Sequence, residues 1–374
     1  MKNRNILFHK THTTSEEMDA VLDTIKSGWL TMGPKTIKFE EDFKGYLEVK
    51  EAVALNSATA ALHLALKAIG LQRGDEVIIP TNTFVATAEV VTYFDAVPVL
   101  CDIEYETHNM DVSKAEALVT SKTKVIMPVH FAGQPCDMDE LYNLAEKYDL
   151  KIIEDAAHAL PSSYKGEKVG TLKSDVTCFS FYATKTLSTG EGGMAVTNNS
   201  KYAKNIKVNR LHGISRDVWD RYSGGSWRYD VIDNGNKYNP TDITSALGLV
   251  QLEKLEKMRD QRESISKRYN EAFNGKIEVL EIKSDRKTSF HLYVIKVNNR
   301  DELYDKLKEV GVNTSVHFIP IHEMSYYKEK YNYSVSDYPI ANEVFEKSLS
   351  LPIYPDLSSD DVIYIIKKVL KYAK

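Results

Sequence analysis

The chain has 374 residues, of which 43% are hydrophobic and 27% charged, as is typical of a globular protein and not of a disordered or fibrous one. Its net charge of −5 offers no basic surface for nucleic acid, and no apolar run approaches the roughly 20 residues that span a membrane. The three cysteines lack the spacing of a metal site or a disulfide framework, and residues 1–9 are too polar for a signal peptide, so we expect a cytoplasmic location.

Two amphipathic helices are predicted near the N-terminus. In residues 15–27, Met18, Val21, Leu22 and Ile25 recur at helical spacing, and Ser15 stands where it can cap the first turn. A second helix is predicted over 37–47. Short apolar strands then alternate with helices. The strands are predicted at 52–55, 76–79, 97–101, 124–129, 150–154, 176–179 and 194–197, and the helices at 59–69, 85–94 and 138–148.

This alternation favours an α/β fold with a mainly parallel sheet covered by helices. A long loop over 213–240 precedes a helix that runs from 242 past 262. The remaining elements suggest a smaller α+β unit. They are strands at 291–295 and 314–318, a helix at 301–310 and a final helix around 362–370. Because 374 residues exceed what one core usually holds, we expect a large domain over 1–245 and a smaller one over 246–374.

The residues that follow each predicted strand form the candidate site, because ligands of parallel sheets bind beyond the carboxyl ends of the strands. Residues 56–61 are small, and Ser57 and Thr59 carry hydroxyls at a helix N-terminus, which suits a phosphate. Ordinary helix capping explains the same pattern. Ser180, near the end of a later strand, is either a further phosphate ligand or a plain strand residue.

Three residues that follow strands suit a planar, charged ligand. Phe84 can stack on a ring or pack in the core. Asp155 can hold the pyridine nitrogen of pyridoxal phosphate (PLP) in its protonated form, or cap a helix. His158 can lie near the same ring, or be an ordinary buried histidine. Two further histidines, His317 and His322, have no carboxylate at ligand spacing, so we expect no metal site.

Lys185 ends an apolar run and precedes a glycine-rich turn at 190–193. With an ordinary pKa of about 10.4, a lysine amine is a poor nucleophile at neutral pH. In a partly dry pocket it can form an imine with a carbonyl cofactor such as PLP. A lysine taken alone is more often a solvated surface residue. The order of the motifs favours a lysine that binds a cofactor. This order is a phosphate turn, an aromatic residue, a strand-end aspartate, then a serine and a lysine.

In this order the motifs resemble the DegT-type family of PLP-dependent sugar aminotransferases, which has the aspartate aminotransferase (type I) fold. The resemblance extends over nearly the whole chain. It is carried by NSATAALHLAL at 56–66, PTNTFVAT at 80–87, GQPCDM at 133–138, EDAAHA at 154–159, SFYATK at 180–185, GEGGM at 190–194, KYNPTDI at 237–243 and SLP at 350–352. The implied fold has a large PLP-binding domain and a smaller C-terminal α+β domain.

The resemblance also implies how the cofactor is held. Lys185 would bind PLP as an imine and then move a proton between cofactor and substrate carbons, while Asp155 would pair with the pyridine nitrogen. His158 would lie against the cofactor, and Phe84 would stack on its face. The phosphate would be held by Ser57, Ala58, Thr59 and Ser180, and by Asn239 from the neighbouring subunit of a homodimer.

The implied reaction is transfer of an amino group from L-glutamate to a keto-deoxy sugar of a nucleoside diphosphate sugar. A 4-keto sugar is preferred to a 3-keto sugar, and the product would enter a lipopolysaccharide, another surface glycan or a glycoconjugate. His317, Tyr182 and Glu191 are expected to contact the substrate. The choice of sugar is expected to depend on the loop 213–236 and on residues 317–331, which include Tyr326, Tyr327 and Tyr331.

Three alternatives remain at this stage. One is a PLP-dependent lyase or dehydratase on the same fold, although relatives that act as dehydratases have histidine where this chain has Lys185. Another is a non-catalytic regulator, which has no need to keep both Lys185 and Asp155. The third, a plain α/β binding protein, leaves the order of the motifs unexplained. Two departures from the family pattern are Ala58, where glycine is frequent, and Pro240, where methionine or leucine is frequent.

Overall fold

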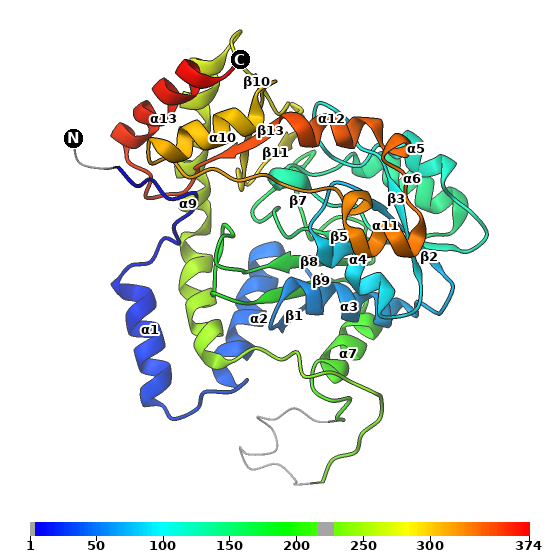
Figure 1. The fold of residues 1–374 in the computed structure, drawn as a ribbon. Helices are drawn as coiled ribbons and strands as arrows, with labels where there is room; N and C mark the ends of the chain where they lie inside the picture. Colours follow the sequence, from blue (N-terminus) through cyan, green and yellow to red (C-terminus); the bar gives the residue numbers. More distant parts are fainter. Residues whose placement is uncertain (1–3, 216–227) are drawn as a thin grey trace.

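The computed structural model describes residues 4–215 and 228–374, and a seven-stranded sheet forms its central layer (Figure 1). In spatial order the strands are β1 (Glu51–Leu55), β9 (Gly193–Thr197), β8 (Val176–Ser180), β5 (Lys151–Asp155), β4 (Thr123–Ile126), β2 (Glu76–Pro80) and β3 (Val97–Cys101). The predicted mainly parallel sheet is confirmed, because only β9 runs against its neighbours β1 and β8.

The direction of β9 follows from its connection to β8. No helix separates these two strands, so the chain turns back directly and pairs antiparallel. The turn over 181–192 therefore lies at the carboxyl end of β8, where the parallel strands also end. This turn contains Lys185.

Helices cover both faces of the central sheet. Alternate strand residues enter opposite cores, as the two-residue period of a strand requires: in β1, Ala52 and Ala54 pack on one side and Val53 and Leu55 on the other. The first core is covered by α2 (Pro34–Leu47), α5 (Val112–Ala117), α6 (Met138–Tyr148) and the first half of α9 (Asp242–Phe273). The second is covered by α3 (Ala58–Ile69), α4 (Val85–Thr92), α7 (Ser200–Asn209), α11 (Ser325–Tyr331) and α12 (Pro339–Lys347).

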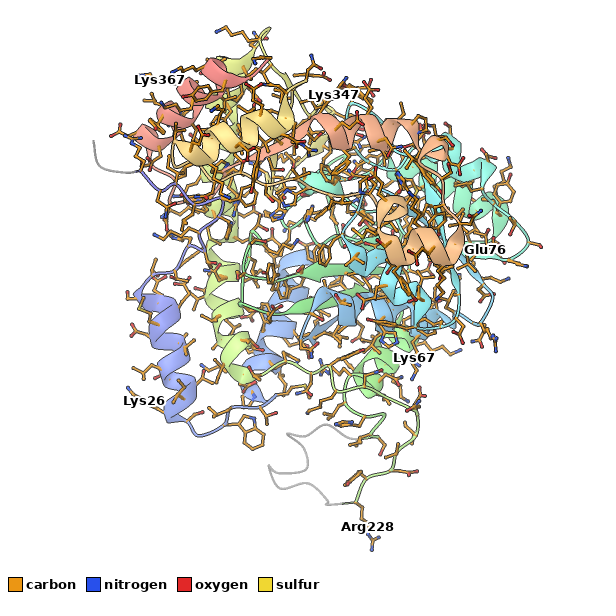
Figure 2. All side chains as sticks on the ribbon, in the orientation of Figure 1. Lys26, Lys67, Glu76, Arg228, Lys347 and Lys367 are labelled. Carbon is orange, nitrogen blue, oxygen red and sulfur yellow. The ribbon has the colours of Figure 1, made fainter. Side chains whose placement is uncertain are left out.

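A third core lies around a small antiparallel sheet at the other end of α9 (Figure 1). The sheet consists of β10 (Glu278–Val279), β12 (Tyr293–Lys296) and β13 (Ser348–Leu351), flanked by α10 (Arg300–Glu309) and α13 (Ser359–Tyr372). A further small sheet joins β11 (Arg286–Lys287), β6 (Ser163–Tyr164) and β7 (Glu167–Lys168). Side chains fill the space between α9 and the layers around it, and Lys367 on α13 lies at the edge of the molecule (Figure 2).

The first helix, α1 (Ser15–Lys26), lies beside α9, and the residues it buries are the polar Glu17 and Thr24 (Figure 1). Its buried residues include Glu17, which accepts hydrogen bonds from Gln251 (2.8 Å) and Lys254 (2.9 Å) of α9. Met18, Leu22 and Ile25 are exposed by 65%, 46% and 51% in the single chain. The docked face is thus polar, and the apolar face has no cover within the described residues. The predicted cap was also wrong: Thr14, and not Ser15, caps α1 and forms a capping box with Glu17.

The predicted strand at 314–318 was also wrong. These residues are irregular apart from one bridge, in which Ser315 pairs with Ser350. The strand that adjoins them is β13, for which the sequence had offered no prediction. Among the described residues, no helix is both long and apolar enough to cross a membrane.

The carboxylate of Asp242 joins α9 to α2. Asp242 lies in the first turn of α9, is 2% exposed, and accepts hydrogen bonds from the backbone N–H groups of Gly33 (2.7 Å), Lys35 (3.0 Å) and Thr36 (3.0 Å). The Thr36 hydroxyl donates a fourth hydrogen bond at 2.7 Å. Because Gly33 offers no side-chain cap to α2, this carboxylate satisfies N–H groups at the helix N-terminus that would otherwise be unpaired.

We predict that Asp242→Ala lowers the free energy of unfolding by about 3 kcal/mol, because it removes several charge-assisted hydrogen bonds inside the protein. Asp242→Asn should cost less, since the amide oxygen still accepts. Urea unfolding followed by circular dichroism measures both. Asp19→Ala, at an exposed position of α1, is the control and should be neutral. An Asp242→Ala protein as stable as that control would contradict the capping role.

Candidate active site

A cavity of about 560 Å³ lies beyond the carboxyl ends of the central strands. The structure brings together around it all the predicted site residues except Asn239. They are Ser57, Ala58, Thr59, Phe84, Asp155, His158, Ser180, Tyr182, Lys185, Glu191 and His317. They come from the ends of β1, β2, β5 and β8, from the β8–β9 turn and from the segment after α10. Among the described residues, no group of three or more His, Cys, Asp or Glu side chains is arranged to hold a metal ion.

One end of the cavity is the N-terminus of α3. Ser57 is the N-cap, and its Oγ accepts the N–H of Ala60 at 3.1 Å. The N–H groups of Ala58 and Thr59, in the first turn, have no partner within a helix and remain for a ligand. Because Ala58 adopts a helical conformation, glycine is not required there. Glycine is required at Gly193, where a Cβ would lie 2.5 Å from the carbonyl group of Ser57.

Asp155 lies in the middle of the cavity wall and is 5% exposed. Its Oδ2 accepts a hydrogen bond from the Thr87 hydroxyl (2.8 Å), and its Oδ1 accepts one from the Ala157 N–H (3.1 Å). Burial raises the pKa of this carboxyl, while the two hydrogen bonds and Lys185 act in the opposite direction. No cation of the described residues lies within 4.0 Å of it. The site therefore holds a buried carboxylate that lacks a close counter-ion.

Lys185 is partly buried in the same wall. Its backbone N–H donates to the carbonyl of Tyr182 at 2.9 Å, and the neighbouring Thr186 hydroxyl donates to the carbonyl of Leu160, which fixes the turn. Burial lowers the pKa of the Lys185 amine to about 8, although the negative charge of Asp155 acts to raise it. Roughly half of the amine is thus unprotonated near pH 8, which makes it a competent nucleophile and base.

Three phenylalanine rings also line the cavity. Phe84, the residue before α4, is 58% exposed and packs at 6.0 Å (ring centroids) from Phe318. Phe318 stacks near His158 at 5.9 Å. Near the N-terminus, Phe8 stacks on His317 at 5.5 Å. An exposed aromatic face at the mouth of a cavity suits a planar ligand.

The histidines of the site are uncharged at neutral pH. Burial lowers the pKa of His158 well below its usual value, and it lowers the pKa of His317 to about 4. His317 Nδ1 lies 2.9 Å from the hydroxyl of Ser350. His291 lies 4.3 Å from His158 (ring centroids), and burial lowers its pKa too. These rings can exchange hydrogen bonds with a ligand without placing further positive charge beside Lys185.

Several residues of the cavity were not predicted as site residues. Phe8 and His291 precede a helix and a strand, and a search of the residues after strands overlooks them. Phe318 lay in the wrongly predicted strand. Thr87 does not line the cavity but bonds to Asp155, and it had a usable signal, since it follows Phe84 by three residues and so lies on the same side of α4. The N-terminal segment is also attached to the turn that carries Lys185, because the Thr11 hydroxyl donates to the carbonyl of Ala183 at 2.8 Å.

Other expected residues lie elsewhere. Asn239 is not part of the cavity wall; its Nδ2 donates to the carbonyl of Pro240 at 3.0 Å, and its buried Oδ1 has no hydrogen-bond partner among the described residues. Tyr327 packs in the second core with Tyr331 at its edge, and Tyr326 is exposed, so none of the three lines the cavity of the described chain. Of the loop 213–236, residues 216–227 lie outside the described residues.

A family model, related sequences and solved structures all match this chain over nearly its whole length. Residues 11–370 match the DegT/DnrJ/EryC1/StrS aminotransferase family. The protein MJ1066 of Methanocaldococcus jannaschii is 49% identical over 365 residues, which cover 95% of this chain and 94% of that protein. The spore coat polysaccharide biosynthesis protein SpsC of Bacillus subtilis is 45% identical over 370 residues, covering 96% and 95%. Among solved structures, the PLP form of Spr1654 from Streptococcus pneumoniae has a TM-score of 0.93 at 36% identity, covering 98% of both chains. The chain therefore belongs to the DegT/DnrJ/EryC1/StrS aminotransferase family, and it is a PLP-dependent enzyme with the fold of these aminotransferases.

Proposed function

We propose that this enzyme transfers an amino group from L-glutamate to the keto-deoxy sugar of a nucleoside diphosphate sugar, with a 4-keto sugar preferred to a 3-keto sugar. The product would serve the biosynthesis of surface glycans or glycoconjugates. Similarity to SpsC, which is named for spore coat polysaccharide biosynthesis, supports a sugar substrate. The observation that carries the proposal is the presence, in one cavity, of a lysine with a lowered pKa and a buried carboxylate without a close counter-ion.

The described cavity fits PLP at three points. The free N–H groups at the start of α3, with the hydroxyls of Thr59 and Ser180 nearby, suit the phosphate. The exposed ring of Phe84 offers a face for the pyridine ring. Asp155 lacks the cation that a protonated pyridine nitrogen would supply. We therefore assign Ser57, Ala58, Thr59, Phe84, Asp155, His158, Ser180 and Lys185 to the cofactor.

When bound, PLP supplies an aldehyde that captures an amine and a protonated ring that withdraws electrons from the carbon losing its proton. Asp155 provides the fixed negative charge that stabilises the protonated ring nitrogen. The Nζ of Lys185, unprotonated in part because burial lowers its pKa to about 8, can take a proton from the amino donor and return one to the acceptor. The neutral ring of His158 would lie against the cofactor, and Phe84 with Phe318 would keep water from one face.

The substrate would occupy the open part of the cavity. Tyr182 is 47% exposed there, Glu191 is exposed, and His317 lies deeper, held by Ser350. These three side chains offer hydroxyl, carboxylate and imidazole groups to the hydroxyls and carbonyl of a sugar. Phe8 and Phe318 add apolar surface that suits a deoxygenated position.

A homodimer with shared active sites is part of the proposal. The apolar face of α1 is exposed in the single chain, as expected for a surface that another subunit covers. Asn239 lies outside its own chain's cavity, and its Nδ2, which donates to the Pro240 carbonyl in the single chain, would be the donor to the partner's phosphate site. Isologous packing of this kind is the commonest symmetry of homodimers.

Two further assignments accompany this proposal. The division into domains at 1–245 and 246–374 falls within the first turns of α9, and Ile6 packs in the third core with the C-terminal elements, so the N-terminal segment would connect the two domains. A cytoplasmic location agrees with the three cysteines, all of which are buried and free.

Adding L-glutamate to the PLP-loaded enzyme is expected to bleach its visible absorption band, because amino transfer converts the bound aldehyde to pyridoxamine phosphate. After glutamate is removed, a panel of 4-keto and 3-keto nucleoside diphosphate sugars should restore the band only with the true acceptor, and we expect a 4-keto sugar to do so. An absorption band that does not change when glutamate is added, together with release of ammonia or water from an amino or deoxy sugar, would favour the lyase or dehydratase alternative.

Capture of PLP by the apoprotein is expected to accelerate with pH through about 8. Below this pH the Lys185 amine is protonated and cannot attack; because burial lowers its pKa, the free amine appears about two pH units earlier than in an ordinary lysine. Borohydride trapping at a series of pH values, followed by mass spectrometry, measures the rate. Lys185→Ala should trap no PLP at any pH in the series. A midpoint near 10.4 would refute the lowered pKa.

Mixing inactive Lys185→Ala chains with Asn239→Ala chains is expected to restore about one quarter of the wild-type activity at limiting PLP. In a shared-site dimer, half of the mixed molecules are hybrids, and each hybrid has one site with both residues intact. Activity assays after subunit exchange, with the mass checked by ultracentrifugation, provide the measurement. If the mixture is only as active as the average of the separate variants, each site uses residues of one chain.

A further inference from the structure

We propose that Thr87 is a positioning residue for Asp155, and that Thr83 and Thr87 form a directed chain of hydroxyls that keeps Asp155 ionised and oriented toward the cofactor ring. This inference rests on the proposed pairing of Asp155 with PLP. It assigns a role to two threonines outside the set expected to bind cofactor or substrate.

The direction of the chain follows from hydrogen-bond chemistry. The Thr83 and Thr87 hydroxyl oxygens lie 2.8 Å apart, and Thr87 Oγ1 lies 2.8 Å from Asp155 Oδ2. An ionised carboxylate only accepts hydrogen bonds, so Thr87 donates its one proton to Asp155. Thr83 must then donate to Thr87. Both threonines are 0% exposed, so bulk water cannot replace either hydrogen bond.

The fold brings Thr87 to Asp155 from a segment that is not a direct neighbour of β5 in the sheet. Asp155 ends β5 and the threonines follow β2, with β4 between them in the sheet. Thr87 lies in the first turn of α4, and its N–H donates to the carbonyl of Phe84 at 3.2 Å. One helical turn therefore carries both the aromatic ring at the cavity mouth and the hydroxyl that reaches the carboxylate.

The backbone of Asp155 is held independently of Thr87. Its N–H donates to the carbonyl of Pro128 at 2.9 Å, and its carbonyl accepts the N–H of His130 at 3.1 Å. On the other face of β5, Glu154 pairs with the His130 ring at 2.7 Å and accepts the Thr177 hydroxyl at 2.8 Å. Removing the Thr87 hydroxyl should therefore change the orientation and charge of the Asp155 side chain and leave the strand in place.

The groups around Asp155 determine in which direction its pKa changes when the Thr87 hydrogen bond is removed. Lys185 from the β8–β9 turn and His130 from the segment after β4 lower the pKa of Asp155, and Cys178 of β8 is a further ionisable neighbour. Burial raises that pKa, and the Thr87 hydrogen bond counteracts the burial. Without this bond the pKa of Asp155 rises, so the carboxylate takes up a proton at a higher pH than in the wild type.

The test is the affinity of the apoprotein for pyridoxamine phosphate, measured by calorimetry over a series of pH values. This ligand has no aldehyde, so its binding does not require the free amine of Lys185, and its own titrations are common to all variants. We expect Thr87→Val to raise Kd about tenfold and to move the acid-side loss of affinity up by about one pH unit. Thr87→Ser should restore both properties, and Thr83→Val should show a smaller change in the same direction.

Thr92→Val is the matched control, because Thr92 lies on the same helix and its hydroxyl donates only to the carbonyl of Glu89, at 2.7 Å. Its affinity and pH profile should equal those of the wild type, and melting curves establish that each variant is folded. Asp155→Asn distinguishes the positioning role of the threonines from the pairing of Asp155 with the cofactor. If Asp155→Asn binds poorly while Thr87→Val and Thr83→Val bind like the wild type, the positioning role is wrong. If Asp155→Asn binds normally with an unchanged pH profile, the pairing of Asp155 with the cofactor is wrong as well.

Discussion

Burying a carboxylate in a protein costs free energy unless a cation lies beside it. Asp155 is such a buried carboxylate. The chain surrounds the carboxylate with hydrogen-bond donors and provides a lysine in the same cavity, but within the described residues it supplies no cation in direct contact. The missing charge is one that a protonated heterocycle can bring. The same burial that makes Asp155 receptive also lowers the pKa of Lys185 to about 8, so one dry cavity prepares both groups.

The topology of the sheet explains why these groups meet. Parallel strands all end at one edge, and helices whose N-termini lie at that edge contribute unpaired N–H groups. Because β8 and β9 pair antiparallel, the chain turns back at this edge of the sheet. A crossover helix after β8 would instead have taken the chain away from the edge. Lys185 thus faces Asp155, although the two residues belong to different connections of the chain. The close approach of β9 to the phosphate turn at Gly193 joins these features at one end of the cavity.

Much of this arrangement could be predicted from the sequence because it depends on local patterns. Apolar runs ended by polar residues identified the central strands, and the order of Ser57, Phe84, Asp155 and Lys185 identified the cavity. Patterns of this kind do not say which partner covers a surface. The spacing of Met18, Leu22 and Ile25 correctly predicted a helix, but the described residues do not cover that face. Alternating residues at 314–318 resembled a strand, although they lie beside the cavity, where a single bridge replaces a ladder. Phe8 and His291 reach the site through contacts that are distant in sequence, and no local pattern indicates such contacts.

The N-terminal segment has a consequence for how this protein is handled and how its relatives are compared. Phe8 forms part of the cavity wall, Ile6 pairs with Val312 beside the small sheet, and Thr11 is bonded to a carbonyl two residues before Lys185 across 172 positions of sequence. Residues 6–11 are therefore part of the candidate site, and removing them or altering their contacts would change the surroundings of Lys185. The chain ends after α13 at the edge of the molecule, beside α10, and none of the α13 residues lines the cavity, so a tag there would avoid this change (Figure 1).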